Sequence, residues 1–363
     1  MLKNDVNNAV RWFWKEGKIP KGCNASFIAL VPKKQTTLDL DDYRPISLVG
    51  CVYKIISKIL ENRLKIVLPK VIDSTQSTFI KGRGLLDSIL VANGIVEEYR
   101  RKKKRLEIVQ IDYEKTYDSV NWDFLYHMIE RMGFCDRWIS WIKESLGSSL
   151  VLVLVNGSPT KEFAPTRGLR KGDPMTPFLF LVVVEDLAGL VRQAIKKDLY
   201  NGIKVGYNDT NVGLLQFADD TLFLCEAKAQ NAQTLKVILR SFELALGLRV
   251  NFSKTKFGGL GLDASLLKVF SNTQNCKHMD VPFVYLGMPI GGNPRLKQFW
   301  QPMIENVNSR LAKWKGKLIS MAGRVCLIKF VLFSLPLYYL SFYKMPKYVS
   351  NKLLKVQRNF LWG

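Results

Sequence analysis

The sequence predicts an α+β fold, because strand-like and helix-like patterns alternate along the chain. Strand-like runs cover residues 106–113, 150–155, 213–217 and 221–225, and Asn156-Gly157 after the second run is a strong hairpin-turn signal. Apolar residues at helical spacing cover 53–68, where Pro69 ends the pattern, together with 122–132 and 232–246. Acidic residues stand at strand ends, which makes them the first candidates for a functional site.

Length and charge narrow the class of protein. The 363 residues exceed one ordinary compact core, so we expect two or three subdomains. A hydrophobic content of 47% and an aromatic content of 11% indicate a folded chain. The net charge of +23 indicates a polyanionic partner, either nucleic acid or an anionic membrane face.

Cysteine spacing and hydropathy exclude two further classes. The six cysteines are scattered without CxxC spacing and only two histidines are present, which argues against a zinc knuckle or a disulfide framework. We expect reduced thiols in an intracellular compartment. The apolar run 325–343 could suggest a membrane span. Lys329 and Pro336 within it favour a buried helix pair broken at Pro336, and we expect no membrane partner.

Positive charge is concentrated in two segments. Residues 100–105 read RRKKKR, which fits a solvated loop tip, a nuclear-import signal or a phosphate contact. Residues 291–363 hold 13 Lys and Arg against the single acid Glu305, a net charge of +12. Lys313, Lys315 and Lys317 alternate around Trp314 in this segment. A solvated helix face is one reading, but so large an excess fits better a surface that follows a nucleic-acid backbone.

Three aspartates carry the chemistry that we expect. Asp219 and Asp220 are adjacent between two apolar strands, where like charges repel unless a cation is present. Asp112 ends another predicted strand. Two divalent metal ions held by such carboxylates can activate a 3′-hydroxyl and stabilise departing pyrophosphate. Asp is also a common turn residue, so a hairpin turn without a metal is the alternative for Asp219-Asp220.

Ordered motifs connect these aspartates to a known family. The segments DYRPISLVG (42–50), QSTFIKGRG (76–84), DYEKTYD (112–118), TRGLRKGDPMTPFLF (166–180), FADD (217–220), GLRVNFSKTK (247–256) and YLGMPIGG (285–292) occur in this order. Together they resemble the reverse transcriptases of LINE-type (non-LTR) retrotransposons. KLISMAGRVCLIK (317–329) and the closing FLWG are similar to the thumb region of plant elements.

The resemblance implies a right-hand polymerase fold with fingers, a palm built of an antiparallel sheet plus helices, and a helical thumb. Residues 1–105 would belong to the fingers, 106–290 to the palm with a finger insertion around 119–165, and 291–363 to the basic thumb. The implied activity is RNA-directed DNA synthesis with two Mg²⁺ or Mn²⁺ ions. Its partners would be an RNA template, a DNA primer or target, and dNTPs, with the nucleus as the place of action. The oligomeric state is not indicated.

Carried onto this sequence, the family motifs assign roles to individual residues. Asp112 and Asp219 would be the main metal ligands, with Asp220 in support and Asp118 structural. The nucleotide site would comprise Lys33, Arg44, Tyr117, Lys171 and Gly172, with the Tyr117 ring excluding a 2′-hydroxyl. Gly168 and Gly172 would let the backbone approach template or nucleotide, and Lys254 would protonate the leaving pyrophosphate. Template and primer contacts would come from Gln76, Arg83, Tyr285, Gly287, Lys313, Lys315 and Lys317.

Departures from the family pattern leave alternatives open. Lys171 stands where the family usually has Gln, Thr116 where it has Ala, and Thr176 where it has Ser. The chain also lacks the flanking endonuclease and C-terminal domains of full elements, which suggests a fragment or a decayed copy. A catalytically inactive nucleic-acid-binding remnant is therefore the alternative function. A group II intron maturase is a further alternative within related families, and the thumb motif favours the LINE-type interpretation.

Overall fold

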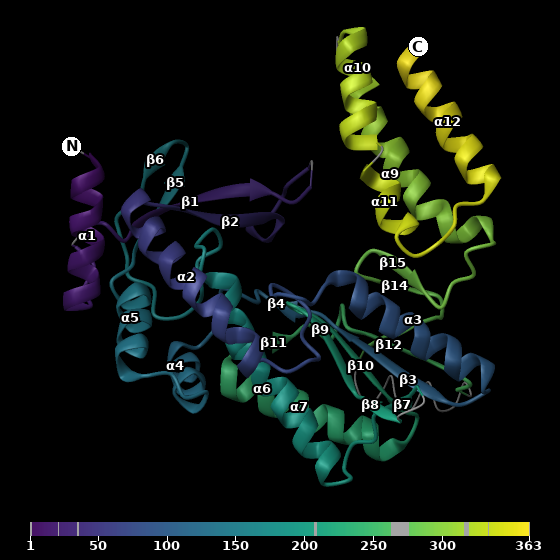
Figure 1. Ribbon diagram of the computed structural model, residues 1–363, viewed down its shortest axis with the longest axis horizontal. Coiled ribbons are helices and arrows are strands. Elements are labelled where there is room, and N and C mark those ends of the chain that lie inside the picture. Colours follow the sequence, from purple (N-terminus) through teal and green to yellow (C-terminus); the bar gives the residue numbers. More distant parts are fainter. Residues whose placement is uncertain are drawn as a thin grey trace. The chain divides into compact units, whose positions relative to one another are not determined.

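The computed structural model describes residues 2–20, 22–34, 36–206, 209–262, 276–315, 319–332 and 334–362 (Figure 1). It forms two compact units, residues 1–280 and 281–363. The helices of the first unit are α1 (Leu2–Glu16), η1 (Leu40–Asp42), α2 (Cys51–Val71), α3 (Leu85–Arg101), α4 (Trp122–Arg131), α5 (Asp136–Gly147), α6 (Thr176–Lys196) and α7 (Ala229–Leu246). The mixture of these helices with two main sheets confirms the predicted α+β class.

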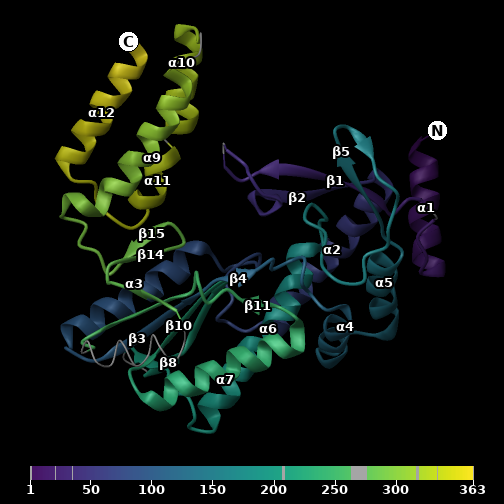
Figure 2. The same cartoon turned by 180° about the vertical axis from the view of Figure 1, so that it is seen from behind.

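A five-stranded sheet forms the centre of the first unit. Its strands are β3 (Leu106–Ile111), β9 (Leu214–Phe217), β10 (Asp220–Glu226), β12 (Lys256–Leu260) and β13 (Lys277–Met279), in the order β13-β12-β3-β10-β9. β3 and β10 are buried along nearly their whole length, because helices cover both faces of the sheet. Figures 1 and 2 show α3 on one side of this sheet and α6 and α7 on the other.

A second sheet contains most of the DYRPISLVG segment of the sequence. Its strands are β1 (Ala25–Pro32), β2 (Tyr43–Val49), β5 (Leu150–Val155) and β6 (Ser158–Pro159), in the order β2-β1-β5-β6. β5 and β6 are joined by Asn156 and Gly157 with φ angles of 50° and 82°, which confirms the hairpin turn predicted from these two residues. β1 pairs with β5 in parallel, so residues about 120 positions apart share this sheet.

Three short pairs complete the strands. β4 (Tyr113–Glu114) pairs with β11 (Arg249–Val250), β7 (Ile203–Val205) with β8 (Thr210–Val212), and β14 (Phe283–Tyr285) with β15 (Met288–Ile290). The predicted strand 106–113 is therefore interrupted at Asp112, where the chain passes from β3 into β4. At this interruption the Asp112 N–H donates to Thr255 Oγ1 at 3.3 Å, and the Asp112 carbonyl accepts the N–H of Asn251 at 2.8 Å.

The predicted end of α2 at Pro69 is wrong, since the helix continues to Val71. Pro69 removes one backbone donor and its ring crowds the carbonyl of Lys65 four residues earlier, so the helix extends only two residues beyond it. The backbone N–H of Ile72 then donates to Leu68 O and closes the helix at 2.9 Å.

The second unit consists of the β14–β15 hairpin and a set of helices. These are α9 (Lys297–Lys315), α10 (Met321–Leu327), the π-helix η2 (Ile328–Leu332), α11 (Ser334–Leu340) and α12 (Lys347–Trp362). Trp300 is fully buried, and its indole N–H donates to Pro294 O at 2.7 Å. Its ring and those of Phe299 and Tyr339 pack together and form the centre of this unit.

The apolar run 325–343 lies in α10, η2 and α11, but the predicted buried pair broken at Pro336 is wrong, since Phe330 and Leu337 are 78% and 59% exposed and α11 continues through Pro336. α11 begins at Ser334, so Pro336 lies in its first turn, where proline is tolerated. No helix in the described part of the chain has the length and hydropathy needed to cross a membrane. None of the six cysteines, all of which lie in the described part of the chain, forms a disulfide.

Glu107 is buried in the middle of β3, and its burial predicts a pH-dependent stability. Desolvation raises the pKa of Glu107 to about 8, although Cys225 lowers it somewhat. The folded state therefore holds a proton that the unfolded state releases near pH 4.5, so the free energy of unfolding falls as pH rises towards 8. The free energy of unfolding should therefore fall by several kcal/mol between pH 5 and pH 8 in the original chain. In the Glu107→Gln variant most of this fall should disappear, as measured by urea unfolding at the two pH values.

The matched control is Glu97→Gln on α3, where the side chain is exposed. This variant should retain the pH dependence of the original chain. Equal pH dependence in the Glu107→Gln variant and the original chain would show that Glu107 stays ionised in the folded state.

Candidate active site

The structure brings Asp112, Asp219 and Asp220 to one end of the five-stranded sheet. Asp112 follows β3 directly, Asp219 lies in the turn between β9 and β10, and Asp220 begins β10. In the antiparallel pairing of β10 with β3, Thr221 lies opposite Ile111, so the next position sets Asp220 beside Asp112. Neighbouring strands are about 4.8 Å apart, which places these carboxyl groups close to one another.

A buried glutamine holds the turn that carries Asp219. Ala218 has a φ of 55°, a left-handed conformation, and its backbone N–H donates to Gln76 Oε1 at 3.0 Å. The same oxygen accepts the N–H of Thr78 at 3.1 Å, and Gln76 is only 1% exposed. Thr116 Oγ1 donates to Asp219 Oδ2 at 3.3 Å. The contact expected between Gln76 and template or primer is therefore replaced by a structural role beneath the catalytic turn.

The carboxyl groups disturb one another electrostatically. Desolvation raises the pKa of Asp112, with a further contribution from Asp219, while Lys254 acts in the opposite direction. Asp220 remains exposed, yet partial desolvation and the charges of Asp219 and Asp112 raise its pKa. A divalent cation would relieve this repulsion.

The donor atoms suit such a cation. Carboxylate oxygens are the ligands that Mg²⁺ and Mn²⁺ prefer. Among the described residues, no three Asp, Glu, His or Cys side chains are gathered closely enough to hold a metal by themselves. Mg²⁺ in general retains several waters and takes phosphate oxygens from its substrate, so two or three aspartates fit its needs.

Three lysines share a cavity with two of the carboxylates. The cavity has a volume of about 310 Å³ and is lined by Asp112, Asp220, Lys254, Lys256 and Lys277, together with Gln110 and Ile111. Lys254 lies here, as its predicted role near the reaction requires. The sequence interpretation missed Lys256 and Lys277. The two-residue spacing of Lys254 and Lys256 could have indicated a shared face, whereas Lys277 arrives through the pairing of β13 with β12.

A larger cavity gathers the predicted nucleotide-binding residues. Its volume is about 670 Å³, and Lys33, Arg44, Tyr117, Lys171 and Asp219 all line it. Lys33 directly follows β1 and Arg44 lies in the neighbouring strand β2, whereas Tyr117 and Lys171 come from loops of the central region. The fold therefore brings three cations and the Tyr117 ring from distant segments together with Asp219, one of the three candidate carboxylates.

Lys171 is held by an ion pair inside this cavity. Its Nζ lies 2.8 Å from Asp118 Oδ2, and both side chains are partly exposed. The lysine that stands at position 171 in place of the usual Gln is thus paired with Asp118, a carboxylate of the DYEKTYD motif. Exposed pairs of this kind contribute at most about 1 kcal/mol to stability, so Lys171 can leave Asp118 for a phosphate at small cost.

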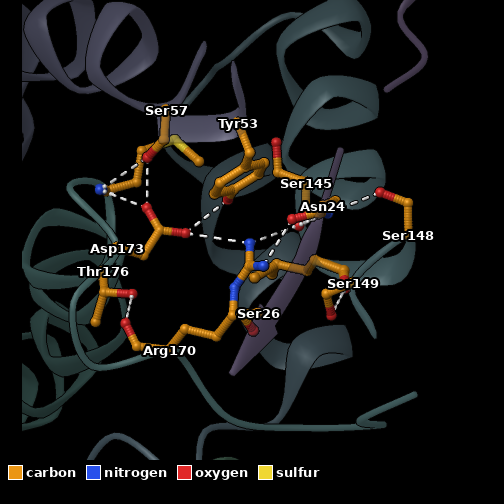
Figure 3. A network of polar contacts seen from close by, with 12 residues as sticks. Asn24, Ser26, Tyr53, Ser57, Ser145, Ser148, Ser149, Arg170, Asp173 and Thr176 are labelled. Atoms are coloured by element: carbon orange, nitrogen blue, oxygen red, sulfur yellow. Dashed lines mark hydrogen bonds and ion pairs between the residues drawn. The ribbon is translucent and has the colours of Figure 1, made fainter. Parts of the chain in front are cut away.

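A buried polar network fixes the loop that carries Lys171 (Figure 3). Asp173 accepts hydrogen bonds from Tyr53 at 2.6 Å and from Ser57, and it pairs with Arg170 at 3.2 Å. Arg170 also donates to Asn24 Oδ1 at 2.6 Å. Because Arg170 and Asp173 flank Lys171 and Gly172, the network sets the position of both residues in the cavity walls.

Gly172 is required for a close approach within the protein, and its expected contact with template or nucleotide stays a prediction. Its φ is 114°, and a Cβ atom there would lie 2.6 Å from Ser47 O. Ser47 N in turn donates to Lys171 O at 2.7 Å. Gly168 behaves similarly, since a Cβ atom would lie 2.8 Å from Asp118 O. Both glycines therefore pack backbone against backbone.

We expect Gly172→Ala to lower the free energy of unfolding by about 3 kcal/mol, combining left-handed strain with overpacking against Ser47. Gly157→Ala is the matched control, since Gly157 has a φ of 82° but no atom within 4 Å of a built Cβ. It should cost only the strain of about 1 kcal/mol. Urea unfolding of both variants measures the difference. If both variants lose the same free energy of unfolding, the loop that carries Gly172 moves away from Ser47 without cost.

Arg83 also differs from the expected template or primer contact. Its guanidinium donates to the backbone carbonyls of Asp73, Gln76 at 2.9 Å and Ile72 at 3.1 Å. These bonds tie down the loop between α2 and α3. Its role in this structure is to shape that loop rather than to present a free cation.

The remaining predicted contacts lie in the second unit. Tyr285 is buried at the end of β14, and Leu286 and Gly287 form the turn to β15 with φ angles of 51° and 79°. Tyr338 Oη donates to Leu286 O at 2.8 Å and supports this turn. The side chains of Lys313 and Lys315 and all of Lys317 lie outside the described residues, so their predicted roles stay predictions.

Comparison with known proteins decides the family. Residues 31–290 match the family model described as "Reverse transcriptase (RNA-dependent DNA polymerase)". This range includes all three carboxylates, the whole smaller cavity, and the larger cavity except for Ile28 and Leu30. The chain belongs to this family. Solved structures of apo telomerase from Candida tropicalis resemble this reverse transcriptase chain with TM-scores of 0.52. Their sequence identities of 14% and 13% extend over 80% and 99% of this chain and 59% and 67% of theirs. This likeness confirms the predicted right-hand polymerase fold.

Curated relatives come from mobile elements. A 149 kDa protein of transposon TX1 from Xenopus laevis is 28% identical over 99% of this chain and 27% of its own length. The Pol polyprotein of retrotransposable element R2 from Popillia japonica is 25% identical over 68% of this chain and 34% of its own. These relatives confirm the predicted LINE-type resemblance of the reverse transcriptase chain. The chain spans about a third or less of their lengths.

Proposed function

We propose that this chain is the RNA-directed DNA polymerase core of a retroelement, extending a DNA primer with dNTPs along an RNA template. One observation carries the proposal. Lys33, Arg44, Tyr117 and Lys171 meet Asp219 in a single cavity, although they come from separate segments of the chain. Cations that can hold a triphosphate thereby adjoin the carboxylates expected to hold metal ions.

Asp112 and Asp219 would hold two divalent ions, with Asp220 beside them. Such ions would activate the primer 3′-hydroxyl and neutralise charge developing on the phosphates. The protein contributes by fixing the carboxylates: Gln76 holds the turn, and Thr116 orients Asp219 through its hydroxyl.

The cations would bind and orient the triphosphate. Arg44 offers a forked donor and Lys33 a point charge, and both side chains are exposed at the cavity. Lys33 Nζ already donates to Asp41 O at 2.7 Å, which holds the lysine near the cavity. Lys171 would exchange Asp118 for a phosphate oxygen. Lys254, Lys256 and Lys277 line one cavity with Asp112 and Asp220, where they would bind phosphate groups, and Lys254 would donate a proton to departing pyrophosphate.

Tyr117 would select the sugar. Its ring lies 4.9 Å from that of Phe180, a contact that fixes the ring as a cavity wall. Burial, together with the charge of Asp219, raises the pKa of Tyr117 to about 12, so its hydroxyl group stays neutral at physiological pH. A rigid ring in this place would clash with a 2′-hydroxyl and favour deoxynucleotides.

The subdomain assignment follows from the same proposal. Residues 1–105 with the insertion around 119–165 would act as fingers, because β1, β2, β5 and β6 form one sheet. The five-stranded sheet would be the palm within 106–290, and residues 291–363 the basic thumb. The basic thumb would contact template and primer.

Primer extension tests the proposal. The same DNA primer is annealed in one reaction to an RNA template and in another to a DNA template of the same sequence. With dNTPs and Mg²⁺ the primer should be extended, and the RNA template should be sufficient for extension. Salt-sensitive binding of the RNA–DNA duplex without extension would instead support the inactive nucleic-acid-binding remnant.

A further inference from the structure

Six consecutive cations connect α3 to β3. Arg100 and Arg101 end α3, and residues 102–105 lead to Leu106, where β3 begins. Residues 100–105 are named the basic tip, and all six of its side chains are exposed. None of them lines either cavity of the candidate active site, so the catalytic site does not explain this concentration of charge.

Backbone hydrogen bonds hold the basic tip in a compact turn. The N–H groups of Lys102, Lys103 and Lys104 donate to carbonyls in the last turn of α3, at 2.9, 3.2 and 3.0 Å. Lys103 has a φ of 52°, the left-handed conformation in which many helices end. The basic tip is therefore a folded turn and not an extended basic segment.

A seventh cation lies beside the basic tip. β7 packs against α3, and the backbone of the exposed residue Lys204 lies against Tyr99. Two acids are also close, since burial and then the charges of Glu226 and Glu98 raise the pKa of Tyr99. Each of these two carboxylates is already paired with a lysine, so neither is left to neutralise the remaining cations.

Three of the cations have no counter-charge from the described residues. Lys103, Lys104 and Lys204 form no ion pair with any of them. Like charges gathered on one surface repel each other and destabilise the folded chain. A bound polyanion removes this repulsion, so the arrangement indicates an anionic partner for the basic tip and Lys204.

The basic tip lies at the end of the five-stranded sheet that is opposite the carboxylates (Figure 1). β3 runs from the tip to Asp112 and has six residues, each advancing about 3.3 Å, so the separation is roughly 20 Å. Phosphates of one strand in a duplex are about 3.4 Å apart along the axis. A stacked strand therefore needs about six nucleotides to reach from the carboxylates to the basic tip.

We infer that the basic tip and Lys204 bind the phosphates of RNA that extends beyond the primer duplex. The inference rests on the proposed function for the identity of the strand, because an RNA-directed polymerase works on an RNA longer than the stretch inside its active site. The partner is read by its backbone charge, so binding is independent of sequence.

RNA fits this surface better than two other anionic partners. A protein groove that takes an extended basic peptide would require the last turn of α3 to unfold, together with the hydrogen bonds of Lys102, Lys103 and Lys104. Stable attachment to an anionic membrane takes an apolar anchor as well as cations, and residues 100–105 contain no apolar side chain.

RNA extensions of two lengths on one duplex provide the test. A DNA primer is annealed to RNAs that extend beyond it by two or by about twenty nucleotides, at the 5′ end in one series and at the 3′ end in another. Dissociation constants are measured by fluorescence anisotropy, without dNTPs, over a range of salt concentrations. The variant combines Lys103→Gln, Lys104→Gln and Lys204→Gln.

The variant should bind the long extension about tenfold more weakly than the original chain does, at one end of the duplex or at both. The slope of log affinity against log salt should become shallower by about 2, because each phosphate contact with a single strand contributes about 0.7. Affinity for the short extension should stay unchanged, since two nucleotides do not reach the basic tip.

Two further variants serve as controls. Lys3→Gln, Lys15→Gln and Lys236→Gln together remove the same charge from exposed positions on α1 and α7, and they should leave both affinities unchanged. Arg at the three positions of the test variant keeps the charge and should preserve binding of the long extension. Thermal unfolding should give the same Tm for every variant, because all the substituted side chains are exposed.

Three results overturn the inference: no loss at either end, an equal loss on short and long extensions, or an equal loss in the control with Gln on α1 and α7. Vesicles containing phosphatidylserine are the second probe, and loss of vesicle binding with RNA binding retained overturns the inference in favour of a membrane. If the original chain incorporates no dNTP while the length-dependent binding is intact, the polymerase activity is overturned and the RNA contact stands.

Discussion

Asp219→Asn should reduce the rate of primer extension by a factor of about 10³ or more. Loss of a metal-binding carboxylate forfeits several kcal/mol of transition-state stabilisation, and each 1.36 kcal/mol is a factor of ten. Asn preserves the shape of the side chain and its acceptor for Thr116, so the turn between β9 and β10 should keep its conformation. Single-turnover incorporation of one dNTP is the measurement. Asp112→Asn should behave alike.

The control for charge removal is Asp209→Asn. Asp209 is exposed before β8 and has a φ of 48°, a conformation that Asn also tolerates. This variant should extend primers at the original rate. If Asp219→Asn retains near-original activity while Asp209→Asn does too, the chemistry takes place elsewhere.

Asp173→Asn should lower the free energy of unfolding by about 3–5 kcal/mol. The change leaves the buried Arg170 guanidinium without a counter-charge, and removing one partner of a buried pair carries a cost of this size. Arg170 also lies 4.3 Å from the centre of the Tyr53 ring, so the substitution should also destabilise the packing of α2, which carries Tyr53. Chemical denaturation by urea measures the loss.

Lys171→Gln is the matched comparison, because Lys171 lies between Arg170 and Asp173 in sequence but pairs with Asp118 at the surface. It should change stability by at most about 1 kcal/mol. Its effect should appear instead as a higher KM for dNTPs. A stability loss as large as that of Asp173→Asn would show that the Lys171–Asp118 pair supports the fold.

The strands, the hairpin turn at Asn156-Gly157 and the carboxylates at the strand ends could be predicted because they depend on local patterns. Alternating apolar residues around Asp112 and Asp219 predict strands whatever their partners are. The shared cavity of Lys33, Arg44, Tyr117 and Lys171 was predicted only through the family resemblance, since nothing local connects these segments.

Long-range contacts explain what the sequence could not predict. Gln76 and Arg83 are polar residues in a motif, which suggested nucleic-acid contacts, but their partners are backbone groups that only the fold supplies. Thr116 looked like a minor replacement until its hydroxyl was found to donate to Asp219.

Single-nucleotide incorporation on an RNA-templated DNA primer, followed across a Mg²⁺ titration, tests the central claim most directly. The structure predicts no product without a divalent ion, and a rate that rises and saturates as Mg²⁺ occupies the site formed by Asp112, Asp219 and Asp220. Tight binding of the RNA–DNA duplex with no incorporation at any concentration of Mg²⁺ or Mn²⁺ would contradict it.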